Sequence, residues 1–302
     1  MRTVVVTPAP PRSRAPARRG AGAFVRALAR ACGRDPAATI GVVFTAAVVV
    51  AAVAGPALLT RDPIAVAMGQ RLQPPGAMFP LGTDELGRDI LTRIVHGARS
   101  SVLTAILVIF SAAAFGAIVG GIAGYAGGAI DNVAMRTVDL LMAFPYLILA
   151  MIIAFALGPG LTSTAIALAI VWWPSYARLV RGLVLVLRQH LFVEAARAMG
   201  ARTSRVLGLH ILPHCWPALI VRITTDLGFA IIAGASLSFI GLGPQPPDPD
   251  WGAMISNARH YVMAAWWYGL FPGLALFVAV MGFSLLGDAL HDVGEPRLGG
   301  RG

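Results

Sequence analysis

Residues 189–217 read QHLFVEAARAMGARTSRVLGLHILPHCWP, and this stretch decides how the rest of the chain is organised. It carries several arginines between two long apolar segments, so it is not expected to lie in hydrocarbon. Its first half predicts a short helix with one apolar face at the spacing i, i+3, i+4 and i+7, made of Phe192, Ala195, Ala196 and Met199. Gly200 predicts the end of that helix, because glycine is the usual left-handed residue just past a helix terminus. The stretch therefore predicts two short helices with a break at Gly200.

The first of these helices needs a partner. Isolated helices below ~12 residues are marginal in water. Fixing roughly eight residues costs ~1–2 kcal/mol each in backbone entropy, whereas burying Phe192 and Met199 returns only ~1.5–3 kcal/mol apiece. The deficit favours a helix that docks on something outside the bilayer. A solvated helix that touches lipid headgroups is the alternative interpretation.

The composition is typical of an integral membrane protein. Of the 302 residues, 57% are hydrophobic and 13% are charged, and the mean hydropathy is +0.74. The net charge is +10, all of the basic residues are arginine, and they flank apolar segments, which membrane topology explains better than nucleic-acid binding. A Walker A motif requires lysine, so any ATP must be bound by another subunit.

The charge pattern predicts six membrane helices. Residues 1–35 form a basic tail whose composition indicates disorder. Charge-free runs then predict spans near residues 38–59, 101–124, 135–157, 161–183, 217–240 and 266–288. Pro145 and Pro174 lie inside two of these spans and are expected to kink them. A cleaved signal peptide is the alternative for the first span, but the basic region before it is too long.

Arginine placement predicts the orientation of these spans. With the amino terminus inside, 18 arginines lie on the cytoplasmic side and six outside, as the positive-inside preference requires. The stretch 189–217 and the tail 291–302 are then cytoplasmic, so both termini lie inside. Cys32 and Cys215 also fall on this side, which disfavours a disulfide between them.

Residues 61–99 form a polar external segment before a core at 100–290. Thr83 or Asp84 is a candidate cap for an amphipathic helix at the membrane surface. The apolar positions of that helix are Ile90, Leu91, Ile94 and Val95. A second external loop, 241–265, is rich in proline and is followed by aromatic residues suited to a membrane interface.

Several stretches together resemble one known family. Glu194-Ala195-Ala196, three residues, Gly200, nine residues and then HILP ending at Leu212-Pro213 resemble the EAA signature of ABC importer permeases. FPLGTDELGRDILTRIVHGARSSV at 79–102, ASLSFIGLGPQPPDPDWG at 235–252 and LLGDALHDVGEPRL at 285–298 are similar to the dipeptide and oligopeptide (DppC/OppC-type) branch. The resemblance covers nearly all of the membrane part and leaves out the basic tail.

The resemblance implies an all-α, type I ABC importer transmembrane domain that is not itself an enzyme. Its partners would be a second permease subunit, two ATPase subunits that hold ATP and Mg²⁺, and an external solute-binding protein. The helix around Glu194 would dock in a cleft of an ATPase and couple its closure to alternating access. Di- or oligopeptides would be the cargo, and nickel, glutathione or another small solute is the alternative. No cofactor or metal would be bound by this chain, and the membrane would be that of a bacterial cell.

Charges inside the predicted spans are further candidates for function. Asp226 lies four residues after Arg222, which predicts an intrahelical pair, and a cavity-lining role is the alternative. Asp139 lies three residues after Arg136, so a local pair is again expected. Many relatives carry an acidic residue at the position of Gly234, so the resemblance does not transfer a cargo contact there.

Two other kinds of site are disfavoured. His210, His214 and Cys215 are close in sequence, but Pro213 is expected to disrupt the helix that would align them, so no metal site is predicted. No nucleophile constellation of the kind that a protease needs is present. A secondary transporter or a membrane scaffold remains a different class of interpretation, although each leaves the 189–217 stretch unexplained.

Overall fold

The computed structural model describes residues 32–33, 35–59 and 61–294. Nearly all of the predicted basic tail, and residues 295–302 of the predicted carboxyl tail, lie outside the described residues. Within the described ranges the chain is helical, and the extended pairing found there is one isolated bridge between Thr83 and Asp89. The predicted all-α class is therefore confirmed.

Five helices in the described part are long and apolar enough to cross a membrane, and a bent pair makes up to six. The pair consists of α4 (Gly128–Met142) and α5 (Tyr146–Leu157), whose axes differ by 91°. The five long helices are α2 (Pro36–Leu58), α3 (Ile90–Ala126), α6 (Leu161–Leu187), α9 (Leu212–Phe239) and α11 (Trp266–Gly294). These five helices correspond in order to five of the six predicted spans, and the bent pair lies where the third span is predicted.

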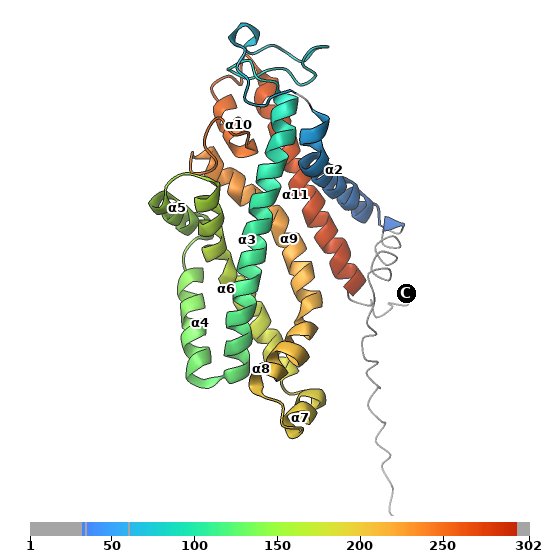
Figure 1. Cartoon of the computed structure of the whole chain (residues 1–302), viewed down its shortest axis with the longest axis vertical. Coiled ribbons are helices and arrows are strands. Elements are labelled where there is room, and N and C mark those ends of the chain that lie inside the picture. Colours follow the sequence, from blue (N-terminus) through green and yellow to red (C-terminus); the bar gives the residue numbers. More distant parts are fainter. Residues whose placement is uncertain (1–31, 34, 60, 295–302) are drawn as a thin grey trace, which may run out of the picture.

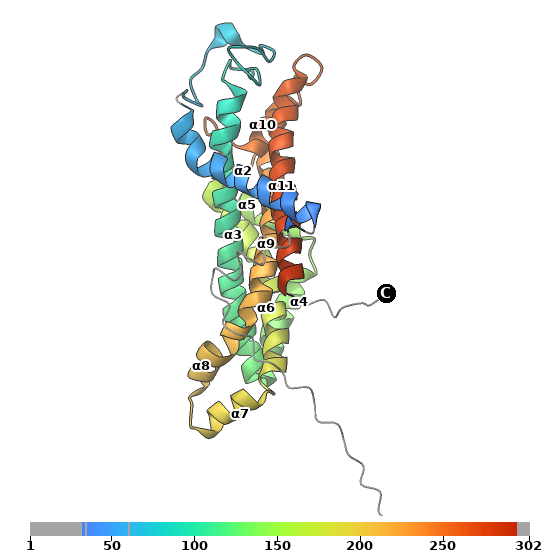
Figure 2. The same ribbon diagram turned by 90° about the vertical axis from the view of Figure 1, so that its right-hand side faces the viewer.

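The long helices lie side by side and give the molecule an elongated shape (Figure 1). One end carries α7 (Leu191–Ala198) and α8 (Thr203–Arg205), and we call it the α7 end. The opposite end, which we call the α10 end, carries α10 (Trp251–Ala258) and the segment that leads into α3. Helix α2 crosses α11 obliquely, as the turned view shows (Figure 2).

Glycines allow α3 to approach α6 closely. A Cβ atom added at Gly120 would lie 2.1 Å from the carbonyl oxygen of Ala177, and one at Gly116 would lie 2.6 Å from that of Trp173. Gly124, one turn further on, faces the carbonyl of Arg181 in the same way. Small residues at such spacing are the usual means by which membrane helices pack backbone to backbone. These contacts hold the centre of the bundle together.

The predicted surface helix of the external segment is wrong, because its residues are the first turns of α3. Asp89, and not Thr83 or Asp84, occupies the N-cap position, and Ile90 is fully buried. The apolar face continues in phase into the charge-free run from residue 100, and neither proline nor a left-handed glycine interrupts it. The chain therefore forms one helix of 37 residues.

The predicted third span, 135–157, is also different from expectation. It is a break between α4 and α5 rather than a kinked helix. Pro145 sits at the N-cap of α5, and the residue before a proline is disfavoured in the α region, so α4 ends ahead of it. Helix α6, in contrast, continues through Pro174. The two prolines that looked alike in the sequence thus have different effects.

Buried charges organise the α10 end. The Asp84 carboxylate is fully buried and accepts a hydrogen bond from Arg88 Nε at 2.6 Å and from the backbone N–H groups of Leu86 and Arg88, both at 2.9 Å. Arg93 Nε lies 3.5 Å from the same carboxylate. Nearby, the carboxylate of Asp250 accepts from Ala253 N–H at 3.0 Å and caps α10, and burial raises the pKa of this carboxyl.

Replacing Asp84 by alanine is expected to lower the free energy of unfolding by about 3–5 kcal/mol, because two buried guanidinium groups lose their shared partner. Thermal unfolding of the detergent-solubilised protein measures the change. Asp62→Ala is the control, since Asp62 is exposed and its side chain accepts one hydrogen bond, from Ile64 N–H. Equal effects of the two substitutions would contradict the structural role given to Asp84.

Candidate functional site

The stretch 189–217 forms the α7 end of the molecule. Helix α7 (Leu191–Ala198) stops where the sequence predicts, with Gly200 in the left-handed region at φ +80°. The Ala201 N–H donates to the Ala196 carbonyl at 3.1 Å and the Gly200 N–H to the Arg197 carbonyl at 2.9 Å. This pair of bonds is a Schellman motif, which satisfies the last carbonyls of a helix. The predicted break at Gly200 is confirmed.

The apolar residues of α7 are divided between two faces, whereas the sequence predicts a single apolar face. Val193 and Ala196 are buried and Phe192 is half-buried, whereas Ala195 is exposed and Met199 is 81% exposed. The predicted stripe is therefore split, because the helix is rotated so that Val193 enters the core. A second apolar stripe faces outward and consists of Leu191, Ala195, Ala198 and Met199. We call these four residues the outward stripe.

Two contacts fix α7 to the ends of long helices. The Phe192 ring stacks on the His214 ring of α9, with centroids 5.0 Å apart and planes inclined by 21°. On the other side, Arg197 Nε donates to the Tyr125 hydroxyl of α3 at 3.2 Å, and its guanidinium lies 5.0 Å from the centre of that ring. These contacts connect α7 to both α3 and α9.

The link from α7 into α9 is nearly continuous. It passes through α8 and a π-helical segment, η2 (Val206–Ile211), and Pro213 then lies in the first turn of α9, directly after Leu212. Pro213 does not end the helical path, and it lies where the π-helical segment passes into α9. His214 Nδ1 bonds the His210 carbonyl at 2.7 Å. Among the residues that the structure describes, no group of three potential metal ligands is found.

The charges within the bundle pair in two different ways. Arg222 Nε donates to Asp226 Oδ2 at 2.8 Å, which confirms the predicted intrahelical pair. The predicted pair of Asp139 with Arg136 is wrong, because Asp139 accepts instead from Arg178 Nη2 of α6 at 2.6 Å. Helix α4 packs against α6, so a partner far along the chain competes with the one three residues away. Asp131 and Arg181 form a second pair between these helices.

A cavity of about 530 Å³ adjoins the Arg222–Asp226 pair. Both residues line it. Asp226 is therefore both paired with Arg222 and part of the cavity wall, so the two alternatives for this residue are both true. Asp139, Arg178 and Gly234 do not line this cavity. The remaining wall is mostly aromatic and apolar, with Leu141, Met142, Phe144, Tyr146, Val171, Trp172, Ser175, Thr225 and Phe229.

The residues that could not be predicted from the sequence are those whose contacts join segments far apart along the chain. Val193, Tyr125 and His214 fix α7, yet only Val193 had a local signal, its position three residues before Ala196. Tyr125 and His214 lie at the ends of α3 and α9, and the packing of the bundle brings them to α7.

A bundle of apolar helices with a short anchored helix at one end and a cavity between the spans is the architecture of a multi-pass membrane protein. The family model described as "Binding-protein-dependent transport system inner membrane component" matches residues 116–300. The chain belongs to this family.

Named relatives agree with this assignment, and one solved structure shares the fold. The chain is 43% identical over 246 residues to the "Probable D,D-dipeptide transport system permease protein DdpC" of Escherichia coli (strain K12), covering 82% of this chain and 83% of that one. It is 42% identical over 240 residues to the "Nickel transport system permease protein NikC" of the same organism, covering 80% and 87%. The MetNI methionine ABC transporter, in inward-facing conformations, shares the fold with a TM-score of 0.54 at 20% identity, covering 67% of this chain and 96% of that chain.

Proposed function

We propose that this chain is one of two permease subunits of an ATP-driven importer, which carries short peptides into a bacterial cell. Two separate ATPase subunits bind ATP and Mg²⁺, and an external binding protein delivers the cargo. The outward stripe of α7 carries this proposal. A helix of eight residues anchored on its inner face, with Leu191 and Met199 each 81% exposed, has an apolar surface ready for a protein partner.

The chemistry of α7 suits an ATPase cleft. Small Ala195 and Ala198 permit close approach of another backbone, while Leu191 and Met199 supply apolar side chains to bury. Glu194 is exposed in the first turn and offers a charge to the partner. Gly200 sets the turn that follows, and Leu212 with Pro213 starts the helix to which motion is passed. Since the chain contains no lysine, a Walker A site must lie on that partner.

The proposal also fixes the orientation. The α7 end lies in the cytoplasm with both termini, and the α10 end faces the binding protein outside an inner membrane. ATP binding closes the ATPases, and α7 transmits this movement through Tyr125 and His214 to α3 and α9. The cavity then opens to the loaded binding protein, and hydrolysis returns it to the inward-facing state.

The cargo proposal follows the dipeptide relative. Because the nickel relative is almost equally similar, identity over the whole chain does not separate the two cargoes. We favour peptides, since the cavity wall combines a charged pair with large aromatic side chains, which suits a zwitterion with apolar groups. Nickel or glutathione remains the second candidate, and the same uptake assay separates them.

Uptake into proteoliposomes tests the proposed function. The chain is reconstituted with the second permease, the ATPases and the external binding protein of its transporter, and uptake of labelled dipeptide is measured with ATP inside or outside. Glu194→Arg and Gly200→Val are expected to lower ATP-driven uptake at least about tenfold. The first reverses the charge that α7 offers to its partner. The second places valine at φ +80°, which costs about 1–3 kcal/mol in strain. Gly208→Ala is the control, as no atom lies within 4 Å of its added Cβ. Uptake driven by an ion gradient without ATPases would overturn the proposal.

A further inference from the structure

The break between α4 and α5 forms part of the wall of the cavity beside Asp226. Met142, Phe144 and Tyr146 flank the break, and all three line the cavity. On the opposite wall, Trp172 and Ser175 lie near the middle of α6, so the break is at membrane depth. Non-helical backbone is tolerated at this depth only where protein buries it or where it lines a water-filled cavity. The Phe144 and Tyr146 side chains at the break are about half exposed in this chain, so we expect a partner subunit to cover them or water to fill the cavity.

The two charges beside the cavity are not equally accessible. The Asp226 side chain is 4% exposed, whereas the Arg222 side chain is 49% exposed. Arg222 donates from Nε to Asp226, and within the described residues its Nη1 and Nη2 groups have no hydrogen-bond partner. A guanidinium presents its donors in a planar fork that fits a carboxylate. Arg222 therefore lines the cavity with N–H donors that are not used in hydrogen bonds within the described residues.

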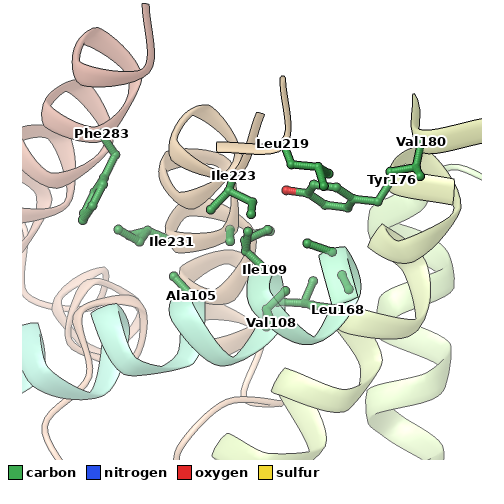
Figure 3. Packing of buried hydrophobic residues seen from close by; sticks show 14 of the residues in the cluster. Ala105, Val108, Ile109, Leu168, Tyr176, Val180, Leu219, Ile223, Ile231 and Phe283 are labelled. Carbon is green, nitrogen blue, oxygen red and sulfur yellow. The ribbon is translucent and has the colours of Figure 1, made fainter. Parts of the chain in front are cut away.

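The negative member of the pair lies beside a buried tyrosine. Tyr176 of α6 is fully buried, and the charged groups that act on its hydroxyl are Asp226 and Arg222. Within the described residues this hydroxyl makes no hydrogen bond. Figure 3 shows it pointing from α6 toward Leu219 and Ile223 of α9. Both residues line the cavity, and the low exposure of Asp226 leaves Arg222 as the more accessible member of the pair.

Helix α5 adds a second positive feature at the same place. It begins at Tyr146, its N-cap Pro145 supplies no side-chain cap, and Phe144 and Tyr146 both line the cavity. The first N–H groups of a helix and its dipole favour an anion. Half-helix ends directed at a carboxylate are a known arrangement in transporters with broken helices.

We propose that this cavity is a binding site for the free carboxylate of the cargo, held by Arg222 and by the N-terminus of α5. Tyr146, Trp172 and Phe229 contact the apolar part of the molecule, and Asp226 positions the Arg222 guanidinium. The inference rests on the proposed function for its cargo, a short peptide with a free carboxyl terminus. The anion preference itself belongs to this chain and can be measured without cargo.

Thiol labelling tests the anion preference. Ser175→Cys places a thiol on the cavity wall, in a chain that carries Cys32→Ser and Cys215→Ser. Rates are compared for methanethiosulfonate reagents that bear a sulfonate or a trimethylammonium group. We expect Arg222→Gln to lower the sulfonate-to-trimethylammonium rate ratio about tenfold, given attraction of a few kcal/mol between nearby charges at intermediate dielectric. Arg259→Gln, at the exposed end of α10 and far from the cavity, should leave the ratio unchanged. A ratio that Arg222→Gln does not alter would overturn the carboxylate site.

A charge swap tests whether transport uses the site. If the pair were only structural, Arg222→Asp combined with Asp226→Arg would restore dipeptide uptake, because the ion pair is kept. The proposed site instead predicts at least about tenfold slower uptake by the assembled transporter, since the cation has moved to a buried position.

Arg222→Gln with Asp226→Asn keeps a neutral pair if the swap fails to fold, and the same loss is expected. Wild-type uptake from either variant would overturn the inference. Absence of ATP-driven uptake in the wild type would overturn the proposed function instead, while the labelling result would still stand.

Discussion

Replacing both Leu191 and Met199 by serine is expected to detach the ATPase from this chain while the chain stays folded in the membrane. Each side chain is 81% exposed and touches little of its own protein, so the fold loses little. Burial against a partner is worth ~1.5–3 kcal/mol for each side chain, and 1.4 kcal/mol is tenfold in affinity. Co-purification of the ATPase with the solubilised chain should therefore fall by at least about 100-fold, and ATP-driven uptake should fall with it.

Met263→Ser is the matched control for this double substitution. Met263 is 98% exposed but lies between α10 and α11, at the other end of the molecule. It should leave ATPase association unchanged. If the double variant retained its ATPase, or if Met263→Ser lost it to the same degree, α7 would not be the docking element.

Substitution of Gly120 by leucine is expected to have the largest effect on folding. The first added carbon would lie 2.1 Å from the Ala177 carbonyl oxygen, far inside the 3.4–4 Å of ordinary contact. That oxygen belongs to the backbone of α6 and cannot rotate away, so α3 and α6 must separate. We expect a loss of at least about 3 kcal/mol, the upper part of the usual range for overpacking.

The fraction of monodisperse protein after heating in detergent measures this loss. Gly182→Ala on α6 is the control, because no atom lies within 4 Å of its added Cβ and alanine favours helix. It should be neutral or slightly stabilising. Equal heat resistance of Gly120→Leu and the wild type would show that the close approach of α3 and α6 is not what holds the bundle together.

The features that could be predicted from the sequence have local causes. The spans follow from runs without charge, and the end of α7 follows from Gly200, where a left-handed residue is needed. The Arg222–Asp226 pair follows from spacing along one helix. Each of these features depends on a few residues that are neighbours in the sequence, so its physical cause is local.

The features that could not be predicted depend on which helices become neighbours. Asp139 pairs with Arg178 rather than with Arg136 because α4 lies against α6. Helix α7 buries Val193 because Tyr125 and His214, from the ends of two other helices, set its rotation. Membrane helices also lack a polar face whose pattern would reveal their packing, so the aromatic and apolar residues of the cavity wall could not be predicted from the sequence.

Site-specific crosslinking from α7 tests the central claim most directly. A photoreactive amino acid at position 199, in the complete transporter in its native membrane, should form an adduct with one ATPase subunit, identified by mass spectrometry through its Walker A peptide. The same amino acid at position 263 should not form it. Adducts from position 199 that contain only lipid, or none with an ATPase, would contradict the account.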